Sequence, residues 1–99
     1  MSNWISEDVN ELFRAVVSLE TEEECRMFFE DACTVREIIE IAQRLKVAKL
    51  LRAKTSYSAI NKETGVSSAT ISRVSRCLDY GSGGYQLVLE RMEKGRGDD

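Results

Sequence analysis

Apolar residues recur at helical spacing through the first third of the chain. One face collects Val9, Leu12, Phe13 and Val16, at i, i+3, i+4 and i+7. The same spacing returns in Cys25, Phe28, Phe29 and Ala32. We therefore predict one helix over residues 6–20 and a second that opens at Thr21.

The expected helix starts carry capping signals. Ser6 precedes two acids, which suits an N-cap and the helix dipole. Thr21 with Glu24, and Thr34 with Glu37, have the spacing of capping boxes. The second box opens the longest expected helix, to about residue 53. Its inward positions are Ile38, Ile41, Ala42, Leu45 and Ala48, widened by Ile39, Val47, Leu50 and Leu51.

The elements shorten after residue 55. Ser56 suits the N-cap of a two-turn helix that ends at Gly65 in the left-handed conformation. Ser67 or Ser68 caps the next helix, which packs Ile71, Val74 and Leu78 inward and ends at Gly81. A last helix over residues 85–94 is expected to bury Tyr85, Val88, Leu89 and Met92. The pattern predicts an all-α single domain over residues 1–99, with a central helix at 34–54 and a helix-turn-helix at 56–80.

Charge is divided unevenly along the chain. Residues 44–78 hold eight basic residues and one acid, Glu63, whereas the chain as a whole has a net charge of −3. The basic residues are Arg44, Lys46, Lys49, Arg52, Lys54, Lys62, Arg73 and Arg76. A basic segment that coincides with a helix-turn-helix favours double-stranded DNA as the partner, although ordinary solvated helix faces would give the same counts.

The second helix of this motif has side chains suited to a major groove. Small residues allow close approach to base edges, and an arginine can reach phosphate or guanine. The predicted DNA contacts are Ser68, Ala69, Thr70, Ser72, Arg73 and Arg76, with Tyr57 and Ser58 as phosphate contacts from the preceding helix. One position departs from the general pattern, because Asn61 stands where a helix-turn-helix usually has alanine.

Composition excludes several other classes. The chain has no histidine, no C-x-x-C pair and three irregularly spaced cysteines, so neither a metal site nor a catalytic residue is predicted. No run approaches the roughly 20 apolar residues that span a bilayer, and the N-terminus lacks the features of a signal peptide. We therefore expect a cytoplasmic protein that is no enzyme and binds no membrane.

Residues 34–81, "TVREIIEIAQRLKVAKLLRAKTSYSAINKETGVSSATISRVSRCLDYG", resemble the Trp repressor family, specifically its TrpR-related proteins of the YerC/YecD type. The resemblance rests on "ATISR" at 69–73, on Gly65 and on "LLR" at 50–52. It implies a six-helix, intertwined homodimer in which the N-terminal helices, residues 1–33, of one subunit pack on the other.

The resemblance also implies a ligand pocket. Its positions here are Thr34, Arg44, Arg73, Val74 and Cys77. Val74 and Cys77 depart from the glycine and serine of the tryptophan-binding repressor, which disfavours L-tryptophan as a corepressor and leaves a different small effector open. Without a ligand, Arg44 and Arg73 could meet phosphates or pair with Glu40 or Glu63.

Two functions follow from this pattern. The first is a sequence-specific DNA-binding transcriptional regulator that acts as a repressor and needs no cofactor. The alternative is a helical dimeric protein-interaction module that has lost specific DNA binding, with its acidic N-terminal third meeting another protein.

Overall fold

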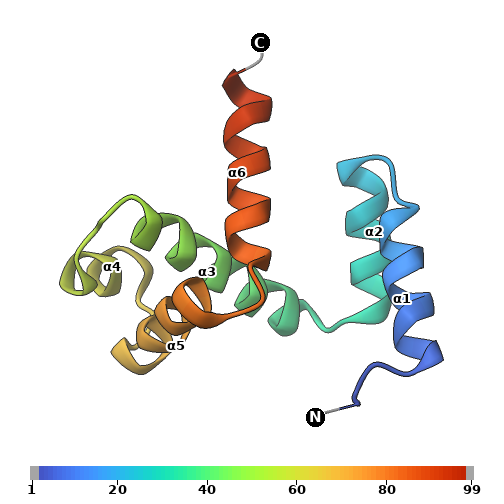
Figure 1. Cartoon of the computed structure of the whole chain (residues 1–99), viewed down its shortest axis with the longest axis horizontal. Coiled ribbons are helices and arrows are strands. Elements are labelled where there is room, and N and C mark those ends of the chain that lie inside the picture. Colours follow the sequence, from blue (N-terminus) through green and yellow to red (C-terminus); the bar gives the residue numbers. More distant parts are fainter. Residues whose placement is uncertain (1–2, 98–99) are drawn as a thin grey trace. The chain divides into compact units, whose positions relative to one another are not determined.

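The structure, a computed structural model, describes residues 3–97 and contains six α-helices in that range (Figure 1). They are α1 (Glu7–Val17), α2 (Glu22–Ala32), α3 (Val35–Arg52), α4 (Tyr57–Thr64), α5 (Ser68–Tyr80) and α6 (Gly84–Gly97). The predicted all-α, six-helix architecture is confirmed. None of the helices in the described range is long and apolar enough to cross a membrane.

The chain divides into two compact units, Met1–Ile38 and Ile39–Asp99. The division falls inside α3, a continuous helix, and not at a linker. A single domain over residues 1–99 therefore remains a prediction.

In the first unit, the predicted caps form with small differences. Ser6 Oγ accepts a hydrogen bond from the Val9 N–H at 3.2 Å, and Thr21 Oγ1 accepts one from the Glu24 N–H at 3.0 Å. The Glu24 carboxylate reaches back to the N–H of Glu20, one residue before the position expected in a capping box. Helix α1 ends at Val17 and not at residue 20, because Ser18 already serves as its C-cap.

The apolar stripes of α1 and α2 are only partly covered within this unit. Leu12 is 46% and Phe13 is 44% exposed, and no residue of α1 or α2 is buried. Phe13 packs edge-on against Trp4, and Phe28 against Phe29. Exposed apolar stripes of this kind are typical of helices that pack on a further surface.

The capping box at the start of α3 forms completely. Thr34 donates its backbone N–H to Glu37 Oε1 at 2.8 Å, and Thr34 Oγ1 accepts from the Glu37 N–H at 3.1 Å. The hydrogen bond from the Thr34 backbone, followed by that from its hydroxyl, lowers the pKa of Glu37 below its ordinary value of 4.5.

This shift predicts a pH dependence of stability. Because the pKa of Glu37 is lower in the folded chain, its stabilising contribution is present above the unfolded pKa and is lost as the pH falls through the folded value. Replacing Glu37 by glutamine removes this titration. The difference in unfolding free energy between the wild type and Glu37→Gln, from urea denaturation at fixed protein concentration, should therefore shrink between about pH 7 and about pH 3. A difference that stays constant over this range would contradict the prediction.

The second unit has one core to which all four of its helices contribute. The fully buried side chains come from α3 (Val47 and Ala48), α4 (Ile60) and α5 (Ile71), and Val74, Val66 and Leu89 complete the cluster. Helix α5 packs on α4 and on α6. The core fixes α5 from behind and leaves its other side at the surface.

Several residues of α3 and α6 that the sequence pattern predicts to be buried are exposed. Ile41 in α3 is 49% exposed, and Val88 and Met92 in α6 are 44% and 50% exposed, so their predicted burial is wrong within this chain. These residues do recur at helical spacing, but no other helix of the described second unit fully covers the helix faces on which they lie. Helix α6 also extends beyond the expected residues 85–94 at both ends.

Candidate nucleic-acid interface

A short turn at residues 65–67 joins α4 to α5, as the predicted helix-turn-helix requires. Gly65 ends α4 in the left-handed conformation, with φ of 75°, and its N–H donates to the Asn61 carbonyl at 2.8 Å. A side chain at that φ would be strained, which explains the glycine. Ser67 is the N-cap of α5 and accepts from the Thr70 N–H at 3.3 Å. The prediction for Gly65 is confirmed, and Ser67 is the capping serine.

Side chains of α4 fix the turn further. The amide of Asn61 donates to the Val66 carbonyl at 2.8 Å. The Thr64 hydroxyl donates to the Ile60 carbonyl at 2.7 Å and accepts from the Val66 N–H at 3.1 Å. The residue that departs from the usual alanine, Asn61, is therefore the group that closes the turn, and Val66 is bonded on both of its backbone polar atoms.

We expect Asn61→Ala to loosen this turn. The substitution leaves the carbonyl of Val66, a buried residue, without its partner, which costs about 1–2 kcal/mol of stability. Amide hydrogen exchange should accelerate at residues 65–70 more than in α6. Unchanged exchange in the turn would show that the backbone holds its geometry without the Asn61 side chain.

Helix α5 has a buried side and an exposed side. Ile71 and Val74 are buried, as predicted. Among the predicted DNA contacts, the exposed members on α5 are Ser68, Ala69, Ser72, Arg73 and Arg76. These five offer two guanidinium groups and three small side chains on one helix, which is the mixture that a major groove accepts.

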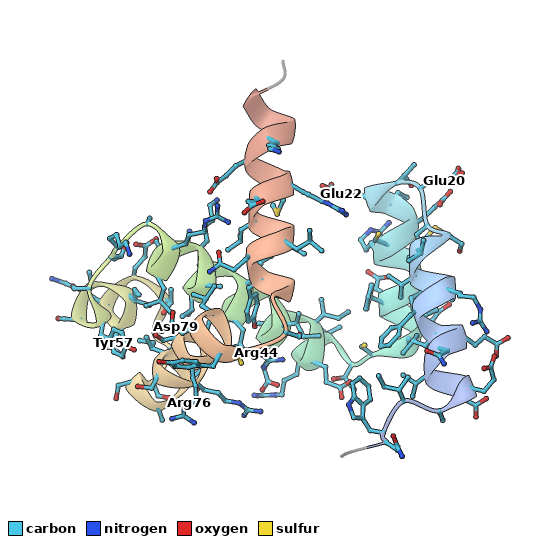
Figure 2. All side chains as sticks on the ribbon, in the orientation of Figure 1. Glu20, Glu22, Arg44, Tyr57, Arg76 and Asp79 are labelled. Atoms are coloured by element: carbon cyan, nitrogen blue, oxygen red, sulfur yellow. The ribbon has the colours of Figure 1, made fainter. Side chains whose placement is uncertain are left out.

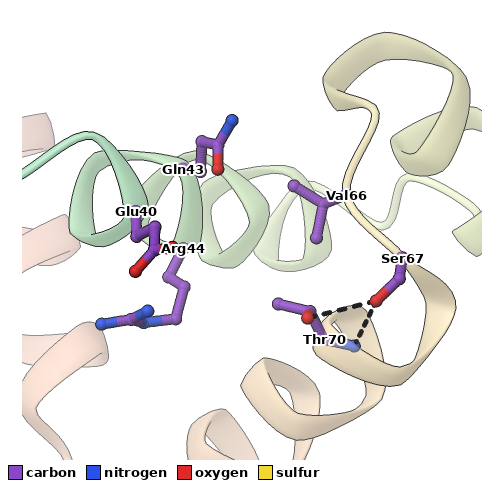
Figure 3. Close-up of a pocket in the computed structure, with 6 residues that line it drawn as sticks. All are labelled: Glu40, Gln43, Arg44, Val66, Ser67 and Thr70. Carbon is purple, nitrogen blue, oxygen red and sulfur yellow. Dashed lines mark hydrogen bonds between the residues drawn. The ribbon is translucent and has the colours of Figure 1, made fainter. Parts of the chain in front are cut away.

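Thr70 differs from the other predicted contacts on α5. It is partly buried, and its hydroxyl is hydrogen-bonded with Ser67 Oγ at 3.2 Å. It lines a cavity beside α3 (Figure 3). Its place in the first turn of α5 agrees with the sequence pattern, but its orientation depends on how α5 packs on α3.

The start of α4 presents the two predicted phosphate contacts. Ser56 caps the helix by accepting from the Ala59 N–H at 3.2 Å, and Tyr57 and Ser58 follow in the first turn. Both are exposed. Figure 2 labels Tyr57 on α4 and Arg76 on α5, the helices of the motif.

Two of the eight basic residues of the segment 44–78 are engaged within the chain. Lys46 pairs with Glu63 at 3.4 Å and links α3 to α4. Arg52 donates to the Gln86 carbonyl at 3.3 Å and pairs with Glu93 at 3.5 Å, which ties α3 to α6. At least one partner in each pair is well exposed, so each ion pair contributes only about 0–1 kcal/mol to stability.

The ion pairs anticipated for the two arginines of the predicted ligand pocket are not formed in the described range. Arg44 makes no ion pair with Glu40 on its own helix, and Glu63 pairs with Lys46 instead of Arg44 or Arg73. The spacing of four residues allows a bridge between Arg44 and Glu40 but does not require it. The charges of Arg44 and Arg73 are thus left available.

A polar cavity of about 350 Å³ lies between α3 and the start of α5 (Figure 3). Its lining residues are Glu40, Gln43, Arg44, Val66, Ser67 and Thr70. Arg44 is the one member shared with the predicted ligand pocket. The others were missed, although Glu40 and Gln43 share a helix face with Arg44, since the spacing within α3 does not reveal which face meets α5.

The remaining positions of the predicted pocket lie elsewhere. Val74 belongs to the core, Arg73 is exposed, and Cys77 lines a separate, mostly apolar groove of about 500 Å³. Thr34 lies in the first compact unit, where it forms the capping box. The groove that includes Cys77 is lined by Ile41, Leu45, Gly81, Ser82, Gly84, Tyr85 and Val88.

Comparison with known proteins identifies the family. The family model described as "Trp repressor protein" matches residues 7–93. The uncharacterized protein YerC of Bacillus subtilis (strain 168) is 48% identical over 87 residues, which are 88% of this chain and 84% of YerC.

Two crystal structures are similar to this fold. A TrpR-like protein from Eubacterium eligens ATCC 27750 matches with a TM-score of 0.85 at 48% identity, over 89% of this chain and 91% of that one. A candidate Trp repressor from Staphylococcus aureus matches with a TM-score of 0.86 at 45% identity, over 93% and 96% of the two chains. The chain belongs to the Trp repressor family.

Proposed function

We propose that the protein is a sequence-specific DNA-binding transcriptional regulator of the cytoplasm, and that it represses by occupying its site. The observation that carries this proposal is the exposed side of α5, with Arg73 and Arg76 beside three small side chains on a helix whose other side is fixed in the core. Proteins of the Trp repressor family are regulators rather than enzymes, which supports the same class.

Affinity and specificity have different sources in this proposal. The segment 44–78, with eight basic residues and one acid, attracts phosphates without regard to sequence. The exposed side chains of α5 contact base edges and supply discrimination, while Tyr57 and Ser58 set the register on the backbone. Thr70, which faces α3, contributes by holding the start of α5 in place.

The proposed active form is a homodimer. Support comes from apolar surface left open on α3 and α6 of the second unit, where Ile39, Ile41, Leu87 and Met92 are each about half exposed. The apolar stripes of α1 and α2 are open as well. Two-fold symmetry would set two copies of α5 one helical turn of DNA apart, so the site should be an inverted repeat.

The proposed regulator works without L-tryptophan. Val74 stands at a glycine position of the family's pocket. Its side chain is 1% exposed and packs in the hydrophobic core. Arg44 lines a polar cavity together with residues of α3 and of the turn. This cavity is where binding of a different small effector should be tested.

The proposal is tested by selecting binding sites from a random duplex library with the purified protein, with and without L-tryptophan. Enrichment of one inverted repeat in both arms is expected. Enrichment only with L-tryptophan would overturn the ligand independence. Failure to enrich any sequence, together with binding that does not respond to salt, would favour the protein-interaction module.

A further inference from the structure

The end of α3 holds an unusual backbone conformation at Lys54. Its φ is 68°, which makes it the one non-glycine residue with positive φ among residues 3–97. The Lys54 N–H donates to the Leu51 carbonyl at 2.9 Å, and the Thr55 N–H donates to the Leu50 carbonyl at 3.0 Å. These two hydrogen bonds define a Schellman motif with Lys54 at the left-handed position.

Glycine is the residue that normally takes this position, because a Cβ is disfavoured there. At the end of α4, the equivalent left-handed position is Gly65. At Lys54 the chain accepts a strained conformation and carries a side chain. Residues held in such conformations are fixed by the structure around them and cluster at functional sites, which points to a use for the Lys54 side chain.

The surroundings of Lys54 indicate that use. The residue is exposed, and within the described residues its ammonium group has no carboxylate within 4.0 Å. It stands two residues before Ser56, the N-cap of α4, in the basic segment 44–78. The first turn of α4 has a positive end of the helix dipole and holds the proposed phosphate contacts Tyr57 and Ser58.

We infer that Lys54 contacts a phosphate of the DNA backbone beside the start of α4. This contact extends the protein's footprint past the recognition helix to the junction of α3 and α4. The inference rests on the proposed function, because it requires that the protein binds duplex DNA. Its plain alternative is a lysine that only complements the negative end of the α3 dipole.

Three substitutions separate the charge from the backbone strain. Lys54→Gln keeps the strain and removes the charge, Lys54→Arg keeps both, and Lys54→Gly removes both. Lys94→Gln, at an exposed position of α6 outside the basic segment, is the matched control for loss of one lysine. Affinity for a duplex selected from the library is measured by fluorescence anisotropy from about 50 to about 300 mM salt, with melting temperatures alongside.

We expect Lys54→Gln and Lys54→Gly to weaken DNA binding about three- to tenfold. Both should also lower the salt slope of log affinity by about 1.8 for the proposed dimer, which is about 0.9 for the one phosphate that each of its two subunits no longer neutralises. Lys54→Arg and Lys94→Gln should retain the wild-type slope. Lys54→Gly should also melt roughly 2–6 °C higher than Lys54→Gln, since glycine relieves the backbone strain.

The outcomes distinguish the inference from the function on which it rests. If the wild type binds with a steep salt slope and Lys54→Gln binds identically, the inference is overturned while the proposed function stands. If the wild type itself shows no salt-dependent binding, the proposed function fails first. If Lys54→Gly does not fold, the comparison of Lys54→Gln with Lys54→Arg still decides.

Discussion

Replacing Ile60 by alanine is expected to lower the free energy of unfolding by about 2–5 kcal/mol. The Ile60 side chain is 0% exposed and is among the largest fully buried side chains of the second unit. It lies in α4 and packs into the cluster that holds Val47 and Ile71, so its truncation leaves a cavity beneath α5. Ile60→Val, which removes one methylene, should cost about 0.5–1.5 kcal/mol.

These values are measured by urea denaturation at one protein concentration, because stability depends on concentration if the protein is a dimer. A loss below about 1 kcal/mol for Ile60→Ala would show that α4 does not pack as described. Ile60 contributes nothing to the exposed side of α5. At temperatures where the variant stays folded, its DNA affinity should therefore remain within a few-fold of the wild type.

Arg73→Ala is expected to weaken binding to a selected site by about 1–3 kcal/mol, roughly 5- to 150-fold. Arg73 is exposed on α5 and makes no ion pair among the described residues, so the substitution removes a charged group without disturbing the fold. The melting temperature should be unchanged. Arg91→Ala on α6, outside the basic segment, removes the same charge and should bind as the wild type does.

Comparing the affinity of Arg73→Ala for the selected duplex and for a scrambled duplex shows whether Arg73 contacts a base or a phosphate. If Arg73 contacts a base, the selected duplex loses affinity and the scrambled duplex does not. If it contacts phosphate, both duplexes lose affinity and the salt slope falls by about 0.9 for each phosphate that Arg73 neutralises. Unchanged binding to both duplexes would remove Arg73 from the interface.

Local features of the fold could be predicted from the sequence. Ser6, Thr21 and Ser56 cap helices as expected, and Thr34 closes its box with Glu37. Each of these interactions joins residues within about four positions, so spacing alone reveals them. Gly65 belongs to the same group, since its conformation is set by the turn that it occupies.

Contacts between helices could not be predicted in this way. Ile41 and Val88 have helical spacing typical of a core but lie half exposed in a groove. Thr70 faces α3, and Arg44 shares its cavity with Glu40 instead of pairing with it. These arrangements depend on which face of α3 meets α5, and no pattern within a single helix determines that.

The left-handed Lys54 is a third kind of feature. A sequence rule expects glycine at a Schellman position, so a lysine there does not predict the conformation. Only the backbone geometry reveals that a charged residue occupies this strained position, two residues before the N-cap of α4.

The proposed role of the exposed side of α5 is to read DNA sequence. The most direct measurement is the affinity of the wild-type protein for the selected inverted repeat and for a scrambled duplex of equal composition, each titrated with salt. We predict tighter binding to the inverted repeat by at least a factor of about 10³ and a steep loss of affinity with salt for both. Equal affinities for the two duplexes, or affinities that salt does not change, would contradict this claim.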